Sequence, residues 1–341
     1  MRLPSTLRCL PLLALVLPGA LRAQSGYHVS RRIATAGEGG WDYLSVDSAN
    51  RRLYVSRGTH VQVIDLEGDS LVADIPNTPG VHGIAFAPRL GRGFTSNGRD
   101  SSVTVFDLRT GQSVMVVHGT GANPDAIAYD DVSRRVFTFN GRSESATAID
   151  AATGRIVGTL PLGGKPESAQ SDGGTMYVNI ESRNAITAFD TRTLAVTAHI
   201  PLPGCDEPTG LGIDRVKQRL YVGCSGNKRA AVVDYAGRRV VAMVAVGAGV
   251  DATDFDPVTG LGFASAGDGT LAVIHEDTPG HFTVESVPTV RGARTMALDP
   301  RTHRIYLSSA QYGATPAPTV DSPRPRPAIV PGSFAVLVVS R

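Results

Sequence analysis

A short segment centred on an aromatic residue recurs seven times along this chain of 341 residues. In each copy an apolar or small residue precedes the aromatic residue, and a short apolar or small stretch follows it. The seven aromatic positions are Tyr54, Phe94, Phe137, Tyr177, Tyr221, Phe263 and Tyr306, at steps of 40 to 44 residues. Self-similarity at such a period indicates stacked supersecondary units, each too small to bury its own apolar face.

Four strand-like runs separated by turn formers make up each repeat. Around Tyr221 these runs are 209–214, 219–224, 230–234 and 239–246. Four strands per repeat over seven repeats predict an all-β fold, a seven-bladed β-propeller with four-stranded blades. The third run usually ends on aspartate, whose carboxylate can accept hydrogen bonds from backbone amides of the following turn. These aspartates are Asp65, Asp107, Asp150, Asp190 and Asp234.

The last repeat has only three strand-like runs, at 295–299, 305–308 and 334–339. A spare run, 27–35, precedes the first complete repeat. We expect the N- and C-terminal strands to pair and so to complete blade seven, because that closure leaves no long exposed strand edge.

Residues 1–23 have the pattern of a secretory signal peptide. Basic residues Arg2 and Arg8 come first, the apolar stretch Leu10–Leu17 follows, and small Ala23 precedes the expected cleavage site. A buried N-terminal helix is the alternative. The remaining residues, 24–341, form the predicted propeller.

Charge and hydropathy exclude several classes of protein. Cleavage removes three of the 33 basic residues against 31 acidic ones, so the mature chain is near −1. No basic stripe of the kind that binds phosphate backbones is present, so we expect no nucleic-acid partner. The mean hydropathy is −0.02, and the only long apolar run is at the N-terminus, so we expect no transmembrane segment.

Residues 177–201 read Y-V-N-I-E-S-R-N-A-I-T-A-F-D-T-R-T-L-A-V-T-A-H-I-P and resemble the YVTN β-propeller repeat. From about residue 27 to 341 the chain is similar to the exported YncE-like proteins of bacteria. The resemblance implies a propeller in the periplasm or outside the cell, and it brings no shared catalytic motif. A Trp-Asp pair occurs once, at Trp41–Asp42, ahead of a first strand. No haem-attachment motif, P-loop or serine nucleophile elbow is present.

Equivalent positions can be compared across the repeats. Twelve residues before each aromatic position, or ten in the fourth repeat, the innermost strand begins at the mouth of the channel. The positions there are Asp42, His82, Asp125, Glu167, Thr209, Asp251 and Arg294. Packing between blades does not require charge at this point. We therefore predict that all of these except Thr209 form a ligand site, the alternative being solvated rim charges.

Oxygen-rich clusters with one histidine suit Ca²⁺, Mn²⁺ or Zn²⁺. The candidate metal ligands are Asp42, His82, Asp125 and Glu167, which come from four consecutive repeats. A divalent metal ion is accordingly the one cofactor that we consider. Arg294 could pair with Asp251 or Asp42, or bind an anionic ligand.

Two further features belong to the mouth face. A proline-rich insertion at about 310–331 could fold over the mouth as a lid, with Tyr312, Arg324 and Arg326 against a ligand, or could be a flexible loop without contacts. Cys205 and Cys224 are expected to form a disulfide after export, a reactive thiol being the alternative.

Three hypotheses about function remain. The first is a non-enzymatic, monomeric binding module for a small molecule, metal ion or envelope protein at the channel mouth. The second is a metal-dependent hydrolase of lactonase type that uses the acidic ring. The third is a structural scaffold of the cell envelope that does not use the mouth.

Overall fold

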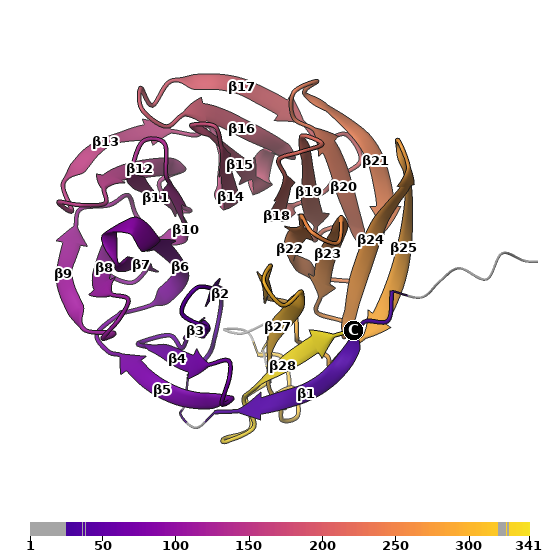
Figure 1. Ribbon diagram of the computed structural model, residues 1–341, viewed down its shortest axis with the longest axis horizontal. Coiled ribbons are helices and arrows are strands. Elements are labelled where there is room, and N and C mark those ends of the chain that lie inside the picture. Colours follow the sequence, from indigo (N-terminus) through magenta and orange to yellow (C-terminus); the bar gives the residue numbers. More distant parts are fainter. Residues whose placement is uncertain (1–24, 36, 38, 320–324, 326) are drawn as a thin grey trace, which may run out of the picture.

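The computed structural model describes residues 25–35, 37, 39–319, 325 and 327–341, so the expected signal peptide lies outside the described residues. Seven four-stranded antiparallel sheets stand around a central channel (Figure 1). Within the described residues the only helical elements are two short 3-10 turns, η1 (Pro88–Leu90) and η2 (Glu181–Arg183). None of the described helices has the length and apolarity to cross a membrane.

Blades one to six each consist of four consecutive strands, ordered from the channel outward. Blades one and two are β2 (Leu44–Asp47), β3 (Arg52–Ser56), β4 (Val61–Asp65), β5 (Ser70–Ile75), and β6 (Val81–Ala87), β7 (Arg92–Asn97), β8 (Ser102–Asp107), β9 (Ser113–His118). Blades three and four are β10 (Pro124–Asp130), β11 (Arg135–Asn140), β12 (Ser145–Asp150), β13 (Ile156–Pro161), and β14 (Pro166–Asp172), β15 (Thr175–Ile180), β16 (Ala185–Asp190), β17 (Val196–Pro201). Blades five and six are β18 (Pro208–Asp214), β19 (Arg219–Cys224), β20 (Arg229–Asp234), β21 (Arg239–Ala245), and β22 (Val250–Asp256), β23 (Leu261–Ala266), β24 (Thr270–Thr278), β25 (His281–Pro288).

Blade seven is assembled from both ends of the chain. It contains β26 (Met296–Asp299), β27 (Arg304–Ser309), β28 (Ala335–Ser340) and, outermost, β1 (His28–Ala34). β1 pairs antiparallel with β28, with Ile33 opposite Val336. The predicted closure of the ring is therefore confirmed, and each sheet has its full set of four strands.

The repeated aromatic residue explains how the blades pack. Six of the seven aromatic side chains are at most 1% exposed, and Tyr177 is half-buried. Tyr54 of blade one contacts Phe86 and Phe106 of blade two, with ring centroids 4.9 and 5.6 Å apart. Tyr221 of blade five and Phe255 of blade six stack with their ring centroids 5.2 Å apart. Each repeat thus contributes an aromatic side chain whose burial against the neighbouring blade stabilises the propeller.

The aspartates at the ends of the third strands cap the following turns as predicted. Asp107 Oδ1 accepts hydrogen bonds from the amides of Arg109 and Thr110, and Asp190 Oδ1 does the same for Arg192 and Thr193. These hydrogen bonds hold the pKa of both carboxyl groups below the usual value.

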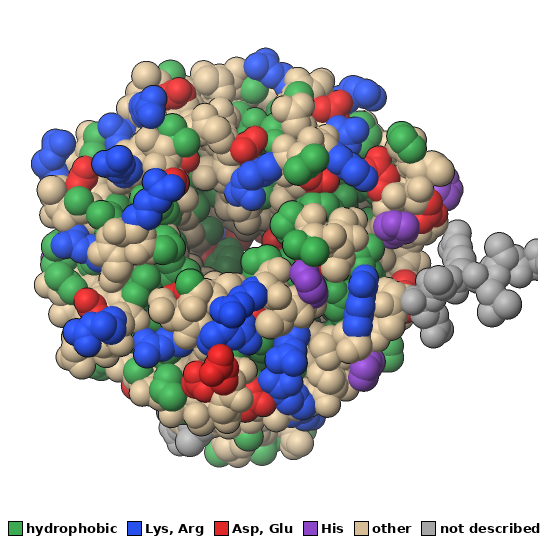
Figure 2. Space-filling model, in the orientation of Figure 1, with side chains coloured by type: hydrophobic (Ala, Val, Ile, Leu, Met, Phe, Trp, Pro, Cys, Tyr) green, Lys and Arg blue, Asp and Glu red, His purple; other side chains and the backbone are tan. Residues whose placement is uncertain are grey.

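The ring has two distinct faces. We call the end at which the innermost strands begin the mouth face, and the end at which they finish the turn face. Figure 2 looks onto the turn face, and the channel opens at its centre. Residues at the starts of β6, β10, β14, β18 and β22 therefore converge on the mouth face.

Candidate functional site

A β-bulge at the start of the innermost strand positions the ring residues. In blade two, Val81 pairs with Asn97 but the next regular pair is Ile84 with Thr95, so His82 lies within the irregular step. The same shift occurs in blades three to six and contains Asp125, Glu167, Thr209 and Asp251, respectively. Bulges redirect side chains and are common beside functional sites.

These residues surround one cavity of about 460 Å³, which we call the mouth cavity. Six of the seven ring positions predicted from the sequence line it: Asp42, Asp125, Glu167, Thr209, Asp251 and Arg294. His82, the seventh, contacts two of these carboxylates from the side. Two charged lining residues, Lys165 and Glu181, were not predicted.

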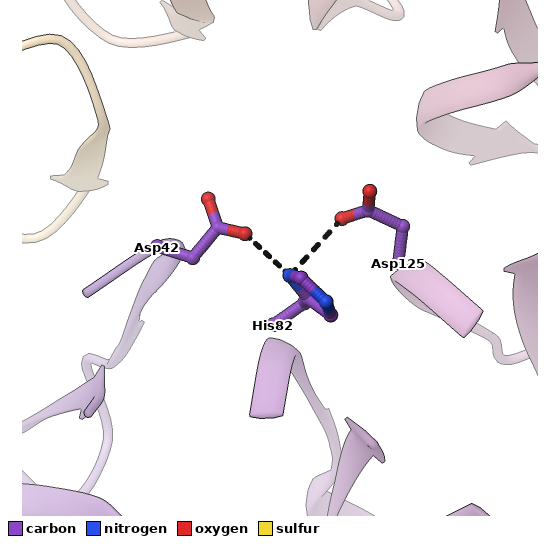
Figure 3. Close-up of side chains that lie close together, drawn as sticks. All are labelled: Asp42, His82 and Asp125. Atoms are coloured by element: carbon purple, nitrogen blue, oxygen red, sulfur yellow. Dashed lines mark hydrogen bonds and ion pairs between the residues drawn. The ribbon is translucent and has the colours of Figure 1, made fainter. Parts of the chain in front are cut away.

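His82 lies between two aspartates of the neighbouring blades (Figure 3). Its Nδ1 atom is 2.7 Å from Asp42 Oδ2 and 3.7 Å from Asp125 Oδ1. Burial by itself lowers the pKa of the imidazole, but the hydrogen bond to Asp42 and the charge of Asp125 outweigh it, so the pKa is raised. The protonated ring is therefore favoured here.

Glu167 is paired with a lysine that precedes it by two residues. Lys165 Nζ is 2.7 Å from Glu167 Oε1 and also contacts Glu181, which begins η2. Burial lowers the pKa of Lys165, but the hydrogen bonds to Glu167 and Glu181 outweigh it and raise the pKa. Burial, and next the charge of Asp125, raise the pKa of Glu167. The ammonium group thus bridges two carboxylates at the mouth.

The guanidinium group at the ring, that of Arg294, contacts one of its two predicted partners. Arg294 Nε lies 3.3 Å from Asp251 Oδ2. Burial nevertheless raises the pKa of Asp251 to about 6, against the lowering effect of Arg294. Burial and the charge of Asp42 raise the pKa of Asp125 to about 6. Negative charge is crowded at this end of the channel.

The residues that line the mouth cavity carry more negative than positive charge. Five carboxylates line it, whereas Lys165 and Arg294 are the only lysine or arginine side chains among its described lining residues. The carboxylates belong to Asp42, Asp125, Glu167, Glu181 and Asp251. Even with His82 protonated, the cavity keeps a net negative charge, so it attracts cations and disfavours anions.

Three of the four predicted metal ligands come together. Asp42, His82 and Asp125 each offer a donor atom, and these atoms lie within 4.8 Å of one another. One imidazole with carboxylate oxygens fits a borderline or hard divalent ion. Glu167 is not a member of this group, and its carboxylate accepts a hydrogen bond from Lys165.

The mouth cavity continues into the channel. A second cavity, of about 440 Å³, lies within the channel. It shares four lining residues with the mouth cavity: Tyr43, Asp251, Ala252 and Met296. Burial raises the pKa of Tyr43 well above its usual range, and the surrounding carboxylates Asp125 and Glu167 add to the effect. Its hydroxyl group therefore stays protonated at this junction.

The base of the blade-seven insertion lies at the rim of the mouth. Tyr312 pairs with Ile329 in an antiparallel bridge, and the ring of Tyr312 is 6.2 Å from that of Trp41. Tyr312 also packs so closely on Gly292 that a Cβ there would lie 2.8 Å from its ring. Of the predicted lid residues, Arg324 and Arg326 lie outside the described residues. A lid remains a prediction.

Cys205 and Cys224 form the expected disulfide, with Cα atoms 5.2 Å apart. Cys224 ends β19 and Cys205 precedes β18, so the bridge ties the loop before the innermost strand to its neighbour in the same blade. Both residues are buried. A persistent disulfide is consistent with an oxidising compartment.

No protein-family model matches the chain, and no curated protein matches it. Among solved structures, a chain of a mitotic checkpoint complex is similar to it, with a TM-score of 0.73 and 14% identity over 89% of this chain and 96% of that one. The WD40 repeats of RRP9 give a TM-score of 0.74 at 8% identity, over 91% and 97% of the two chains. At these identities the likeness establishes the fold alone. The chain is a seven-bladed β-propeller, a fold that commonly serves as a binding or scaffold module.

Proposed function

We propose that this protein is an exported, YncE-like bacterial propeller that binds a small, positively charged molecule in the mouth cavity without turning it over. The observation that carries the proposal is the excess of carboxylates around a cavity of about 460 Å³. That volume is typical of small-molecule sites. Export to the periplasm or beyond rests on the pattern of residues 1–23 and agrees with the buried disulfide.

The pKa values of two mouth-cavity carboxyl groups support a cationic ligand. Desolvation, and also the charge of Asp42, raise the pKa values of the half-buried Asp125 and Asp251 to about 6, so their ionised forms lack compensating positive charge. A ligand ammonium group would supply that charge and be stabilised in return, since hydrogen bonds between ionised groups are the strong ones. Lys165 already shows this arrangement between Glu167 and Glu181.

Calorimetric titration with three four-carbon probes tests the proposal. Putrescine, 1,4-butanediol and succinate are similar in length but carry positive, zero and negative charge. We expect only putrescine to bind, and the double variant Asp125→Asn, Asp251→Asn to weaken it by at least about tenfold. Asp131→Asn, an exposed carboxylate on the turn face, is the matched control. Equal affinity for 1,4-butanediol, or putrescine binding unaffected by the double variant, would overturn the proposal.

A divalent metal ion is a second candidate, favoured by the grouping of Asp42, His82 and Asp125. Elemental analysis after incubation with Mn²⁺ or Zn²⁺ would then find about one ion per chain. Asp42→Asn should lose the ion, whereas Glu167→Gln should keep it, because Glu167 is outside the group of three. The lactonase alternative needs that ion and, in addition, hydrolysis of a simple lactone such as δ-valerolactone. The scaffold alternative predicts that neither the ion nor putrescine binds.

A further inference from the structure

The turn face carries apolar side chains at the tips of four turns. After the innermost strand of blades two, three, five and six, the turn exposes Leu90, Val132, Val216 and Val258. Val216 is 88% exposed and Val258 is 71% exposed, the two highest values among the exposed large hydrophobic side chains. Val216 and Val258 are therefore largely uncovered and available to a partner, whereas Val132 packs beside Gly174 of blade four.

Exposed basic residues accompany these tips. Arg89 precedes Leu90, Arg134 follows Val132 by two residues, and Arg215 and Lys217 flank Val216. All four basic residues are exposed. Three of them have acidic neighbours on the same face: Arg89 Nη2 is 3.3 Å from Asp131, Arg215 Nε is 3.8 Å from Asp172, and Lys217 Nζ is 2.7 Å from Glu276. The two arginine pairs are long and partly exposed, so they are weak and exchange readily for another anion, whereas the Glu276 side chain is only 6% exposed.

The aspartates that end the innermost strands are withdrawn from the surface, whereas Asp131, which pairs with Arg89, is exposed. The innermost strands of blades three, five and six end on Asp130, Asp214 and Asp256, each at most 3% exposed. Their carboxylates accept hydrogen bonds from the amides of Ser133, Val216 and Val258 in the turns they cap. The inner turns of blades two, three and five therefore expose four basic side chains and one carboxylate, that of Asp131, while Asp130, Asp214 and Asp256 lie behind the tips.

The four turn tips all lie on the turn face of the propeller. Each tip occupies the same turn of its own blade, and the blades are arranged around one axis, so the tips stand side by side around the channel. Figure 2 shows this face, with Lys and Arg side chains spread around the ring and apolar ones between them. The surface is broad, and its apolar side chains project singly, each from its own turn.

We propose that the turn face docks on an anionic lipid surface, with Val216 and Val258 at the level of the headgroups. Basic side chains near such a surface are attracted to its negative potential, and apolar tips gain by leaving water. Apolar tips that project singly from separate turns suit a fluid surface, whereas an acidic protein would require a complementary shape. Docking in this way leaves the mouth cavity facing away from the membrane, and it does not depend on what the cavity binds.

Sedimentation with vesicles tests the docking of the mature chain. We expect binding to vesicles of phosphatidylcholine and phosphatidylglycerol in equal parts, little binding to phosphatidylcholine alone, and release by salt. Val216→Asp should weaken binding about tenfold, because it removes an apolar tip. Arg215→Gln should weaken it about fivefold. Val116→Asp, which changes a 45% exposed valine of the outer strand β9, is the matched control and should have no effect.

A second readout reports insertion directly. The fluorescence of a Val216→Trp variant should shift to shorter wavelength when these vesicles are added, and that of Val116→Trp should not. Failure to bind anionic vesicles at low salt would overturn the proposal, as would equal weakening by Val216→Asp and Val116→Asp. Binding to an acidic polypeptide such as polyglutamate, without binding to vesicles, would instead assign the turn face to a protein partner.

Discussion

His82 of blade two holds its imidazole Nδ1 atom 2.7 Å from Oδ2 of Asp42, a residue 40 positions earlier in blade one. The pair joins two neighbouring blades at the mouth. Because the bulge at the start of β6 directs His82 toward the ring, the same side chain also faces Asp125 of blade three. One imidazole therefore links three blades.

The first prediction concerns the pH dependence of this link. The pKa of His82 is raised in the folded chain above the ordinary value of about 6.5, so its protonation stabilises the fold below that pH. This contribution is lost as the pH rises through the folded-state pKa. His82→Gln should therefore cost more free energy of unfolding at about pH 5 than at about pH 9 in urea titrations. His118→Gln, an exposed histidine, is the control, and an equal cost at both values would contradict the assignment.

The second prediction has the opposite sign. The pKa of Asp251 is about 6 in the folded chain, so the ionised carboxylate destabilises the fold at neutral pH. Asp251→Asn should raise the free energy of unfolding above about pH 7, by up to about 3 kcal/mol for a two-unit shift. The gain should shrink as the pH falls through 6 toward 4, where the parent carboxyl is protonated. Thermal unfolding across this range would measure it, and destabilisation by Asp251→Asn at pH 8 would count against the crowding of charge.

The third prediction is the contribution of the disulfide. Cys205 and Cys224 are 19 residues apart, and in the chain-entropy model closing such a loop stabilises by about 3 kcal/mol. The double variant Cys205→Ala, Cys224→Ala should lose about that amount in denaturant titrations under oxidising conditions. Reduction of the parent should reproduce the loss, and reduction should leave the variant unchanged. A stable parent after full reduction would show that the bridge contributes little.

The fourth prediction tests the closure of the ring. Ile33 of β1 is 2% exposed and packs with blade seven and blade one, so Ile33→Ala should cost about 2–5 kcal/mol. Arg32→Ala, whose side chain is exposed on the same strand, should cost far less. Equal effects of the two substitutions on unfolding would mean that β1 does not close the ring.

The sequence predicts the fold well because the repeat constrains every blade at once. Tyr54 and Tyr306 could be aligned with their counterparts by spacing alone, and the strand boundaries then followed within one or two residues. Pairing of β1 with β28 was predicted because the last repeat was one strand short. The turn caps formed by Asp107 and Asp190 are likewise predictable from the sequence.

The site was predictable only in part. Counting back from the aromatic residue located the ring, but the bulges that turn His82 and Asp125 toward the channel leave no distinct signal in the sequence. Lys165 could have been noticed as one of three lysines, two residues before Glu167. Glu181 lies beyond a second strand, and only the three-dimensional arrangement brings its carboxylate to Lys165. Lys165 also pairs with Glu167, which lies outside the group of Asp42, His82 and Asp125.

The fluorescence of Trp41 tests most directly whether the mouth binds a cation. Trp41 is the only tryptophan in the chain, it precedes Asp42 and Tyr43 of the mouth cavity, and its ring contacts Phe334 at 5.2 Å. Titration with putrescine at constant ionic strength should give a saturable change in emission, and that change should be absent in the Asp125→Asn, Asp251→Asn variant. A flat titration of the parent, or the same curve in both proteins, would contradict a cation site at the channel mouth.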